Sequence, residues 1–461
     1  MTTIREVDIA VIGAGIAGIA TAYYLCTEHA KSSVLLIDSR QPMSYTSAQS
    51  GDNYRNWWPH PTMTRFTNDS IDLMEKIALD SSNVLNMTRR GYALATRRGN
   101  IDDLIEDLHT GYGSAASELI RIHGGVSAKH YRAPDEGNWQ EAPAGVDILV
   151  NQNLIRRTFV SFASDIANVV HIRRAGDISG QQLGQYMLQR IKQAGGKRML
   201  ARLRNIEKKQ NFTLDIEAPD GAKRINAAIV VNAAGPFAQE VAAMIGIDVP
   251  IKNVFQQKIA FEDDAQAIPR QLPFVVDLDA PSMGWTDEER SLLADDPDMA
   301  WLTRPIPGGI HCRPEGGDRG KWVKLGWAYN ANASDAQQEL ANDRYHDSHF
   351  PEIVMRGATA LNPSLQQYLE SFPGRWTHYG GYYPMTRENW PLIGPSGVDG
   401  AFIVGALSGF GSMSACAAGA LCAAWIKGKP LPDYAGQLSL SRSEDEGFIA
   451  EIEKNASKGI L

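Results

Sequence analysis

Several features are missing from this sequence of 461 residues, and each absence excludes a class of protein. No apolar run reaches the roughly 18 residues that a membrane-spanning helix needs. An excess of basic residues is also missing, since 45 Lys and Arg against 53 Asp and Glu leave a net charge of −8. We therefore expect no membrane span and no nucleic-acid partner, because broad binding to phosphate backbones needs a basic surface.

Cysteine is scarce, and its spacing fits neither a disulfide framework nor a paired CxxC metal motif. The cysteines are Cys26, Cys312, Cys416 and Cys422. We therefore expect no metal site and a reducing, cytoplasmic location. The first apolar run leads into glycines and is interpreted as a strand, not as a signal peptide. With 43% hydrophobic and 21% charged residues, the composition is globular, and the length suits two domains.

Glycine, by contrast, has a distinctive spacing near the N-terminus. Residues 7–12 form a short, β-branched apolar run, and Gly13, Gly15 and Gly18 follow directly as G-x-G-x-x-G. In such a turn the first glycine permits the tight bend and the second lets a pyrophosphate approach the backbone. The third glycine allows close packing of helix on strand.

The next residues complete a strand–helix–strand unit. Residues 19–25 suit a buried helix, and residues 33–38 form a second strand that ends in Asp38. G-x-G-x-x-G alone is often only a glycine-rich loop, but within this unit it predicts dinucleotide binding. The helix N-terminus supplies N–H groups and partial positive charge for the phosphates. An acid at this strand end accepts hydrogen bonds from ribose hydroxyls, which favours FAD or NAD over NADP.

Three later stretches have the composition expected around a flat cofactor. Residues 46–61 begin small and polar and then contain two tryptophans and two prolines, which predicts an irregular loop beside a heteroaromatic ring. An ordinary surface loop is the alternative. Residues 228–237 read as a buried strand that ends in a small-residue turn, although packing alone explains such a turn. Residues 401–412 repeat this pattern before a helix at 413–425, whose N-terminus would stabilise an anionic, reduced flavin.

Four segments in this order resemble the D-amino-acid oxidase and sarcosine oxidase superfamily of FAD enzymes. They are residues 11–18, 230–235, 384–394 and 405–411. The resemblance implies an α/β fold in which a Rossmann-like FAD-binding domain, similar to that of glutathione reductase, is interleaved with an α+β substrate domain built on a large mixed sheet. It also implies that the cofactor carries most of the chemistry.

The same resemblance implies discontinuous domains. The FAD-binding domain is expected in residues 1–50, 145–240 and 385–440, and the substrate domain in residues 51–144 and 241–384. Residues 441–461 are expected to form a C-terminal helix or tail.

The residues that the resemblance places around FAD come from all of these motifs. They are Gly13, Gly15, Ile16, Ala17, Gly18, Asp38, Ser39, Arg40, Ser47, Ser50, Gly51, Ala234, Gly235, Gly409, Phe410, Gly411, Ser412 and Met413. The candidate catalytic residues are Lys324, Arg55, Tyr383 and His311, and further candidates for the pocket lining are Tyr382, His378, Trp57 and His60.

Lys324 and Arg55 each have two interpretations. Lys324 resembles the lysine that monomeric sarcosine oxidases place by flavin N5 to activate oxygen, where a cation stabilises developing negative charge. The alternative is a lysine whose stem packs while its ammonium reaches solvent or an acid. Arg55 lies where sarcosine oxidases have an arginine close to the ring; it either binds an anion through its planar guanidinium or pairs with a nearby acid.

The sequence departs from the family pattern at three positions. Gly381 occupies the place of the cysteine that tethers FAD in sarcosine oxidases, so we expect non-covalent FAD. Tyr383 replaces the arginine with which glycine and D-amino-acid oxidases bind the substrate carboxylate, and Met413 replaces the corresponding lysine of sarcosine oxidases. Either Arg55 or another residue anchors the carboxylate, or the substrate is not a simple α-amino acid.

We therefore expect an FAD enzyme that oxidises a C–N bond of a small amine or amino-acid derivative by hydride transfer to flavin N5, with O2 as electron acceptor. The first alternative is a dehydrogenase of the same fold that acts on a 2-hydroxy acid or an amino acid and uses a quinone or protein acceptor. The second is a flavoprotein without turnover. The sequence leaves the substrate's identity, its stereochemistry and the oligomeric state open.

Overall fold

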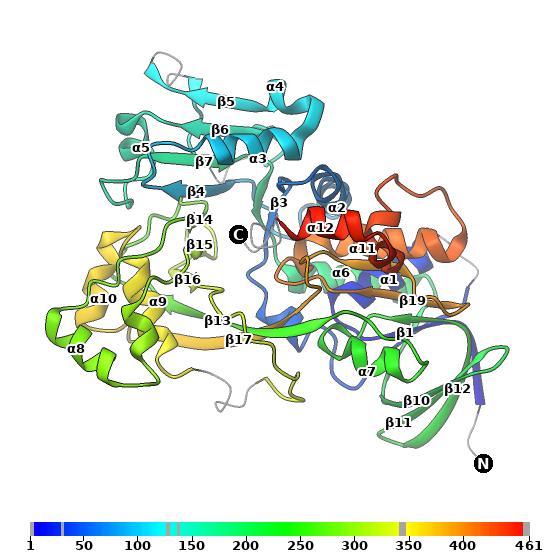
Figure 1. Ribbon diagram of the computed structural model, residues 1–461. Helices are drawn as coiled ribbons and strands as arrows, with labels where there is room; N and C mark the ends of the chain where they lie inside the picture. Colours follow the sequence, from blue (N-terminus) through cyan, green and yellow to red (C-terminus); the bar gives the residue numbers. More distant parts are fainter. Residues whose placement is uncertain (1–3, 29–31, 126–129, 136–138, 341–346, 455–461) are drawn as a thin grey trace.

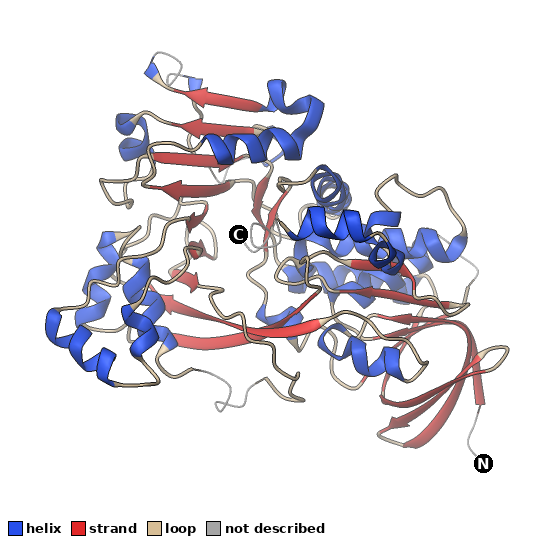
Figure 2. Cartoon of the chain, in the orientation of Figure 1, coloured by secondary structure: helices blue, strands red, loops and turns tan. Residues whose placement is uncertain are grey.

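The computed structural model describes residues 4–28, 32–125, 130–135, 139–340 and 347–454. Their strands form one sheet of eight strands and one of nine, together with a two-stranded ribbon of β3 (Asn53–Arg55) and β8 (Ala175–Asp177). Figure 1 shows the two large sheets in separate lobes, and Figure 2 shows helices packed on both. This is the interleaved α/β architecture that the sequence predicts.

The eight-stranded sheet is mixed and holds the N-terminal strand–helix–strand unit. In sheet order its main path is β10 (Arg202–Lys208), β11 (Phe212–Ala218), β12 (Gly221–Asn232), β1 (Ile4–Ile12), β2 (Val34–Asp38) and β9 (Lys197–Leu200). β19 (Ala401–Gly405) pairs with the end of β12, and β18 (Leu392–Pro395) pairs with β19. β1, β2, β9, β12 and β19 are mutually parallel where they pair, so their carboxyl ends share one edge.

The predicted strands and helix of the first unit are confirmed. Ile9, Ala10 and Val11 of β1 are fully buried, because both faces of this sheet are covered and a parallel strand then reads as a continuous apolar run. The predicted helix is α1 (Ile16–Thr27), which begins directly after Gly15.

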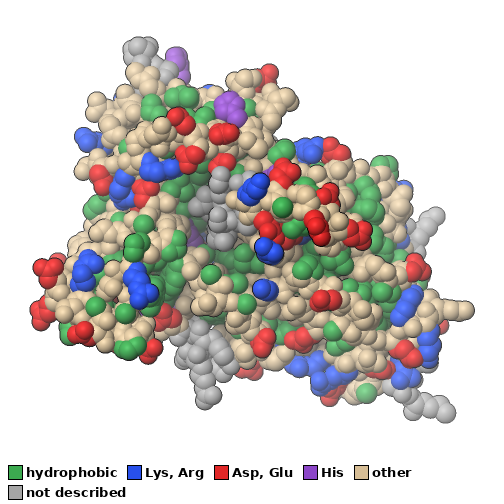
Figure 3. All heavy atoms as spheres, viewed as in Figure 1, with side chains coloured by type: hydrophobic (Ala, Val, Ile, Leu, Met, Phe, Trp, Pro, Cys, Tyr) green, Lys and Arg blue, Asp and Glu red, His purple; other side chains and the backbone are tan. Residues whose placement is uncertain are grey.

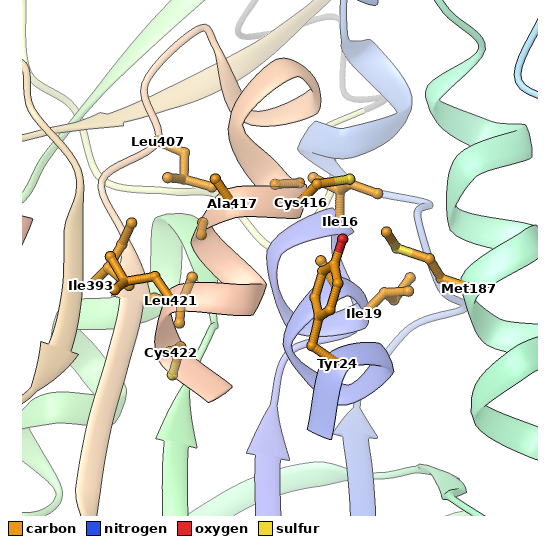
Figure 4. Close-up of a cluster of buried hydrophobic side chains, with 14 of the residues drawn as sticks. Ile16, Ile19, Tyr24, Met187, Ile393, Leu407, Cys416, Ala417, Leu421 and Cys422 are labelled. Carbon is orange, nitrogen blue, oxygen red and sulfur yellow. The ribbon is translucent and has the colours of Figure 1, made fainter. Parts of the chain in front are cut away.

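A helical layer covers one face of this sheet. It contains α1, α2 (Pro61–Asp80), α6 (Gly180–Gln193) and α11 (Gly411–Lys427). Figure 4 shows α1 between α11 and α6, with Ile19 of α1 near Met187 of α6 and Ile16 beside Cys416 of α11. Cys416 and Cys422 lie in this core, and all four cysteines are free and buried. Cys416 and Cys422 are packing residues, as expected from their place in a helix of small side chains.

The nine-stranded sheet is the base of the second lobe. Its order is β17 (Trp376–Met385), β13 (Lys252–Glu262), β16 (Trp322–Gly326), β15 (Ile310–Glu315), β14 (Phe274–Asp277), β4 (Tyr92–Thr96), β7 (Asn168–Ile172), β6 (Val146–Leu149) and β5 (Ile120–His123). The helices of this lobe are α3 (Asp102–Tyr112), α4 (Ala116–Leu119), α5 (Gln152–Thr158), α8 (Asp287–Asp295), α9 (Phe350–Ala358) and α10 (Gln367–Glu370).

The two faces of this sheet differ in chemistry near β13. One face carries Ile259, Phe261 and Leu325 into a core with α9. The alternate positions, which point to the opposite face, carry charged and polar residues such as Lys258 and Arg313. β13 and β17 pair along ten residues and extend as a ribbon from this lobe toward the eight-stranded sheet (Figure 1).

The strand pairing places one segment differently from the expected domain division. Residues 145–240 were expected in the FAD-binding domain, but β6 and β7 pair within the nine-stranded sheet. The first strand after them that leaves this sheet is β8, so a boundary near residue 175 agrees better with the sheets. The chain leaves the nine-stranded sheet only after β7, where a short turn leads to β8 and its pairing with β3.

The C-terminal part packs on the lobe of the eight-stranded sheet. The buried guanidinium of Arg442 donates to Glu388 from Nε at 2.9 Å. α12 (Glu446–Glu453) follows, and its Phe448 ring packs edge-on against the ring of Trp390, with the ring centroids 5.6 Å apart. α7 (Ala238–Ala243) lies on the opposite side of the eight-stranded sheet (Figure 1).

The surface shows no segregation of charge on the face drawn in Figure 3, where acidic and basic side chains both occur over each lobe. Within the described ranges, none of the helices combines the length and the apolar character that crossing a bilayer requires.

The contact between α1 and α11 admits no extra methyl group. A Cβ on Gly419 would lie 2.5 Å from the carbonyl carbon of Ala20 and 2.7 Å from the nitrogen of Thr21. Because these are backbone atoms, Gly419→Ala should force the helices apart and lower the free energy of unfolding by about 1–3 kcal/mol. Thermal unfolding measures this, with Gly436→Ala, whose Cβ would meet nothing within 4 Å, as the control. Equal melting temperatures for the two variants would contradict this packing.

Candidate active site

A cavity of about 400 Å³ lies at the carboxyl ends of β1, β2 and β12. Residues of β17, β13 and the N-terminus of α11 also line it, so both lobes contribute. Of the residues expected around FAD, all line this cavity except Gly18, Phe410 and Met413. Among the expected catalytic residues, Tyr383 lines it. Segments distant in sequence thus meet where the motifs predict.

The glycine turn owes its shape to backbone contacts. Gly13 has a φ of +107°, and a Cβ there would lie 2.3 Å from the carbonyl oxygen of Ala233. A Cβ on Gly18 would lie 1.9 Å from the carbonyl oxygen of Gly13, so Gly18 acts behind the cavity wall through packing. Gly15 lines the cavity, where a Cβ would come within 3.2 Å of the Ser47 hydroxyl.

Asp38 closes this turn from the second strand. Its carboxylate accepts hydrogen bonds from the backbone N–H of Ala14 at 2.6 Å and of Arg40 at 2.8 Å. The hydroxyl of Ser47 accepts from the N–H of Ile16 at 3.1 Å, at the first turn of α1. These bonds fix the donors and acceptors that face the cavity. A carboxylate has about four acceptor positions, so Asp38 keeps capacity for ligand hydroxyls.

The N-terminus of α11 also lines the cavity, and it lies beside the first turn of α1, since a Cβ on Gly411 would come within 4.0 Å of the Ile16 side chain. Ser412 hydrogen-bonds to Ser50 at 2.9 Å and donates to Asp52 at 3.2 Å, which ties the helix to the loop after residue 46. Phe410 is buried against Trp58, with ring centroids 4.9 Å apart, and therefore packs behind the cavity. Met413 is also buried, and its backbone carbonyl accepts from Ser70.

Lys258, on β13, reaches the cavity, and sequence analysis did not single it out. Its Nζ donates to the hydroxyl of Tyr383 at 3.3 Å and lies 5.4 Å from the centroid of that ring. Within the described chain, no carboxylate forms an ion pair with this buried ammonium. The ring of Tyr383 fits because Gly409 has no side chain, since a Cβ there would lie 2.5 Å from the ring.

The ammonium of Lys324 reaches an acid, as in the second of its two interpretations. Lys324 does not line the cavity, and its Nζ pairs with the Glu315 carboxylate at 2.9 Å. Lys324 faces Ala260 across the strands, two residues along β13 from Lys258. The residues that line the cavity thus include Lys258 and not Lys324, which shares a sheet face with Lys258 one step farther along. The role of Lys324 beside a bound cofactor stays a prediction.

His311 lies in one row with Lys258 across three strands. Gly326 of β16 pairs with Lys258 on one side and with His311 on the other. Burial, reinforced by the charge of Lys258, lowers the pKa of His311 to about 4, although its Nδ1 can donate to the Gly309 carbonyl. His311 is therefore neutral at neutral pH, and it stands behind the residues that line the cavity.

Arg55 is wedged between aromatic rings and does not line the cavity. Its guanidinium carbon lies 4.8 Å from the centroid of Trp58 and 5.0 Å from that of Tyr92, and its Nε donates to the carbonyl of Trp57 at 3.2 Å. It is 1% exposed, and burial lowers its pKa. Arg55 was expected near the cofactor, where it could bind an anion. In the structure it packs between Trp58 and Tyr92 and is not among the residues that line the cavity.

Arg313 is a second functional candidate that sequence analysis missed. Its NH2 donates to the carbonyl of Gly51 at 2.9 Å, which fixes one wall of the cavity to β15. The same guanidinium pairs with Asp177 at 3.3 Å and Glu315 at 2.7 Å. A polar residue on a strand of the sheet gave no signal, because its partners come from distant segments.

Comparison with known proteins identifies the family. The DAO family model, described as FAD dependent oxidoreductase, matches residues 8–425. The chain belongs to this family. Human mitochondrial dimethylglycine dehydrogenase is 24% identical over 322 residues, which are 65% of this chain and 32% of that protein. Its mouse counterpart is likewise 24% identical, over 65% of this chain and 32% of its own length. The chain spans about a third of the length of these curated relatives.

Solved structures share the fold of this FAD-dependent family. L-proline dehydrogenase from P. horikoshii superposes with a TM-score of 0.70 at 18% identity, covering 96% of this chain and 99% of that one. Glycine oxidase from Geobacillus kaustophilus superposes with a TM-score of 0.68 at 14% identity, covering 95% and 99%.

The cavity fits FAD, the cofactor of the family. Its lining includes a glycine turn that admits no side chain at Gly13 and a second turn at Gly409, where a Cβ would meet the ring of Tyr383. The first turns of α1 and α11 both line it, and helix N-termini favour anionic groups. Small residues and backbone N–H groups thus surround the middle of the cavity, as a diphosphate between two ring systems requires.

The positive charge of Lys258 should have a measurable effect on the pKa of His311. Lys258→Met should raise the pKa of His311 above about 4, yet keep it below the ordinary 6.5, because burial remains the larger cause. Imidazole NMR titration measures this, and Lys252→Met, at an exposed position of the same strand, is the control. With a folded-state pKa below the unfolded value, stability falls as pH drops from 6.5 toward 4. An unchanged His311 titration in Lys258→Met would contradict the row geometry.

Proposed function

We propose that this chain oxidises a C–N bond in a small amine or amino-acid derivative and passes the electrons to O2. The observation that carries the proposal is the pairing of the Lys258 ammonium with the Tyr383 hydroxyl at the cavity end between Gly51 and Gly409. FAD supplies the electron chemistry when bound, by accepting hydride from the substrate carbon. The protein must therefore bind, orient and keep the substrate in the correct protonation state.

Our assignment of the cofactor contacts follows the cavity from one end to the other. Asp38, Ser39 and Arg40 would hold the ribose; Gly13, Gly15, Ile16, Ala17, Ala234 and Gly235 the diphosphate; and Ser47, Ser50, Gly51, Gly409, Gly411 and Ser412 the flavin end. Gly381 of β17 also lines the cavity and has no nucleophile to form a tether, which supports non-covalent binding.

Lys258 would perform two tasks at the flavin end. Its positive charge lowers the pKa of an amine bound nearby and so favours the neutral nitrogen, whose lone pair assists the loss of hydride. The same charge would stabilise the negative charge that develops on O2 as it is reduced. A substrate carboxylate can also pair with this ammonium, since Tyr383 and Met413 replace the usual anchors.

Tyr383 and Arg313 would set the position of Lys258 and of the neighbouring wall. The Tyr383 hydroxyl holds the ammonium at 3.3 Å, and the bond from Arg313 to the Gly51 carbonyl fixes the facing loop. Such fixed donors need no reorganisation as charge develops, which is the main source of electrostatic catalysis.

The alternative acceptor has one observation in its favour. Two of the similar proteins, dimethylglycine dehydrogenase and L-proline dehydrogenase, are named as dehydrogenases. The alternative function is therefore a dehydrogenase that passes electrons to a quinone or a protein. For the cellular setting we propose a cytoplasmic enzyme with a small-molecule substrate; the expected lack of a nucleic-acid partner stays a prediction.

An anaerobic substrate screen tests the function. The purified yellow protein is mixed without oxygen with amines, N-methylated amino acids, amino acids and 2-hydroxy acids. We expect the visible flavin absorbance to fall with an amine or amino-acid derivative and to return in air with formation of hydrogen peroxide. Bleaching by hydroxy acids alone would refute C–N oxidation. Bleaching by an amine without rapid return in air would refute O2 as acceptor.

The two lysines of the same sheet face offer a matched test. Lys258→Met should slow reoxidation of the reduced enzyme by O2 about 10²-fold, the size of effect seen when one charge-stabilising group is lost. Lys324→Met removes a cation that pairs with Glu315 outside the cavity and should leave this rate near that of the unchanged protein. Stopped-flow absorbance measures both rates. If Lys324→Met slowed reoxidation and Lys258→Met did not, Lys324 and not Lys258 would be the residue that assists the reaction with O2.

A further inference from the structure

Residues 330–338, here called the strap, cross from the second lobe to the ribose end of the cavity. The strap begins beyond β16 and runs alongside β13 and β17 to Gln338, which lines the cavity. The backbone from 331 to 335 is exposed, and its side chains are small or polar. Polar contacts, not apolar burial, therefore decide where the strap lies.

The first half of the strap is attached to β13. Asn330 donates from Nδ2 to the carbonyl of Phe255 at 2.9 Å, and Gln256 donates from Nε2 to the carbonyl of Asn330 at 2.7 Å. Ala333 forms an antiparallel bridge with Val254. This half behaves as a short extra strand at the end of the ribbon that carries Lys258.

The second half of the strap is attached to the FAD-binding lobe. The carboxamide oxygen of Gln338 accepts from Arg40 at 3.2 Å and from Arg202 at 3.1 Å, and its backbone carbonyl accepts from Arg40 at 2.6 Å. The hydroxyl of Tyr45 donates to the carbonyl of Gln337, and that of Tyr382 accepts from its N–H at 3.2 Å.

The partners of the strap at this end belong to the cavity lining. Arg40, Tyr45 and Arg202 line it together with Gln338, and the Arg40 guanidinium stacks over Tyr45 at 4.5 Å and over Phe237 at 5.2 Å. Asp38 is two residues from Arg40, so this is the ribose end. A cofactor that leaves this end must displace Gln338 from both arginines.

We propose that the strap retains FAD: its closure over the ribose end, through Gln338 held by Arg40 and Arg202, limits the rates at which FAD enters and leaves. A covalent bond to FAD is then not needed to retain it. The strap is held by hydrogen bonds from the charged guanidinium groups of Arg40 and Arg202, which are stronger than hydrogen bonds between neutral groups. The strap can still open, because few apolar contacts hold it. This role concerns cofactor exchange and is independent of which substrate is oxidised.

The first test is the release rate of FAD from the holoenzyme. Gln338→Ala removes the shared carboxamide and should speed FAD release at least tenfold, measured by the rise of flavin fluorescence on dilution. The melting temperature of the apoprotein should stay unchanged, because the Gln338 side chain is exposed and belongs to no apolar core. Gln210→Ala, at an exposed glutamine outside the cavity, is the matched control. Release at the control rate, or a lowered apoprotein melting temperature without faster release, would overturn the proposal.

A reversible crosslink between the first half of the strap and β13, five residues before Gln338, tests whether the strap must move for FAD to exchange. Facing residues of an antiparallel pair have Cα atoms about 4.5–5.5 Å apart, a separation that suits a disulfide. Val254→Cys with Ala333→Cys should therefore bond, and the four natural cysteines are buried. Oxidation should slow FAD release from the holoenzyme and FAD uptake by the apoprotein at least tenfold, and reduction should restore both. Each single variant is a control. Equal rates in the oxidised and reduced forms would show that the strap does not gate FAD.

Discussion

The structure depends on a close backbone contact between two turns at the edge of the eight-stranded sheet. Gly13 donates its N–H to the carbonyl of Ile37 at 2.8 Å, and Ala233 donates to the carbonyl of Ile12 at 2.9 Å. The ends of β2, β1 and β12 are thereby held together with no side chain between Gly13 and Ala233. The glycine turn, Asp38 and the turn after Ala233 take their positions at the cavity from these joined strand ends.

The two lobes contribute different chemistry to the cavity. The first lobe offers turns, helix N-termini and small residues, so its contribution is mainly backbone donors. The second lobe offers the side chains of Lys258 and Tyr383 on a paired ribbon. The ribbon is anchored to the first lobe where Asn253 donates to the carbonyl of Pro236 at 2.8 Å. One lobe is thus suited to hold a cofactor and the other to act on what lies beside it.

Local features made the first lobe predictable. The β1–α1–β2 unit is contiguous in sequence, and the spacing of its glycines has a direct steric cause, so strand, turn, helix and Asp38 all lie as expected. The second lobe depends on the register between strands that are far apart in the chain. A motif such as the one around Lys324 does not tell which point of a sheet face meets the cavity. Only the pairing of β13 with β17 and β16 distinguishes Lys258 from Lys324.

β13 was also hard to recognise as a strand. Its centre holds Gln256 and Lys258, and both are buried, although polar residues in the middle of a strand usually indicate an exposed face. They are buried because one turns to the strap and the other to the cavity. A buried lysine without a carboxylate partner is costly in ordinary cores. A lysine at this buried position therefore indicates a function, and the cavity beside it shows where that function would be carried out.

The distribution of charge explains how an acidic protein can hold an anionic cofactor. The net charge is −8, yet the first turns of α1 and α11 and the side chains of Arg40, Arg202 and Lys258 all face the cavity. Fields of this kind act over short distances, because salt screens exposed charges beyond about 8 Å at physiological ionic strength. The surface can therefore stay acidic while the cavity is locally positive. His311 adds no positive charge to this field, because burial and the neighbouring charge of Lys258 lower its pKa to about 4.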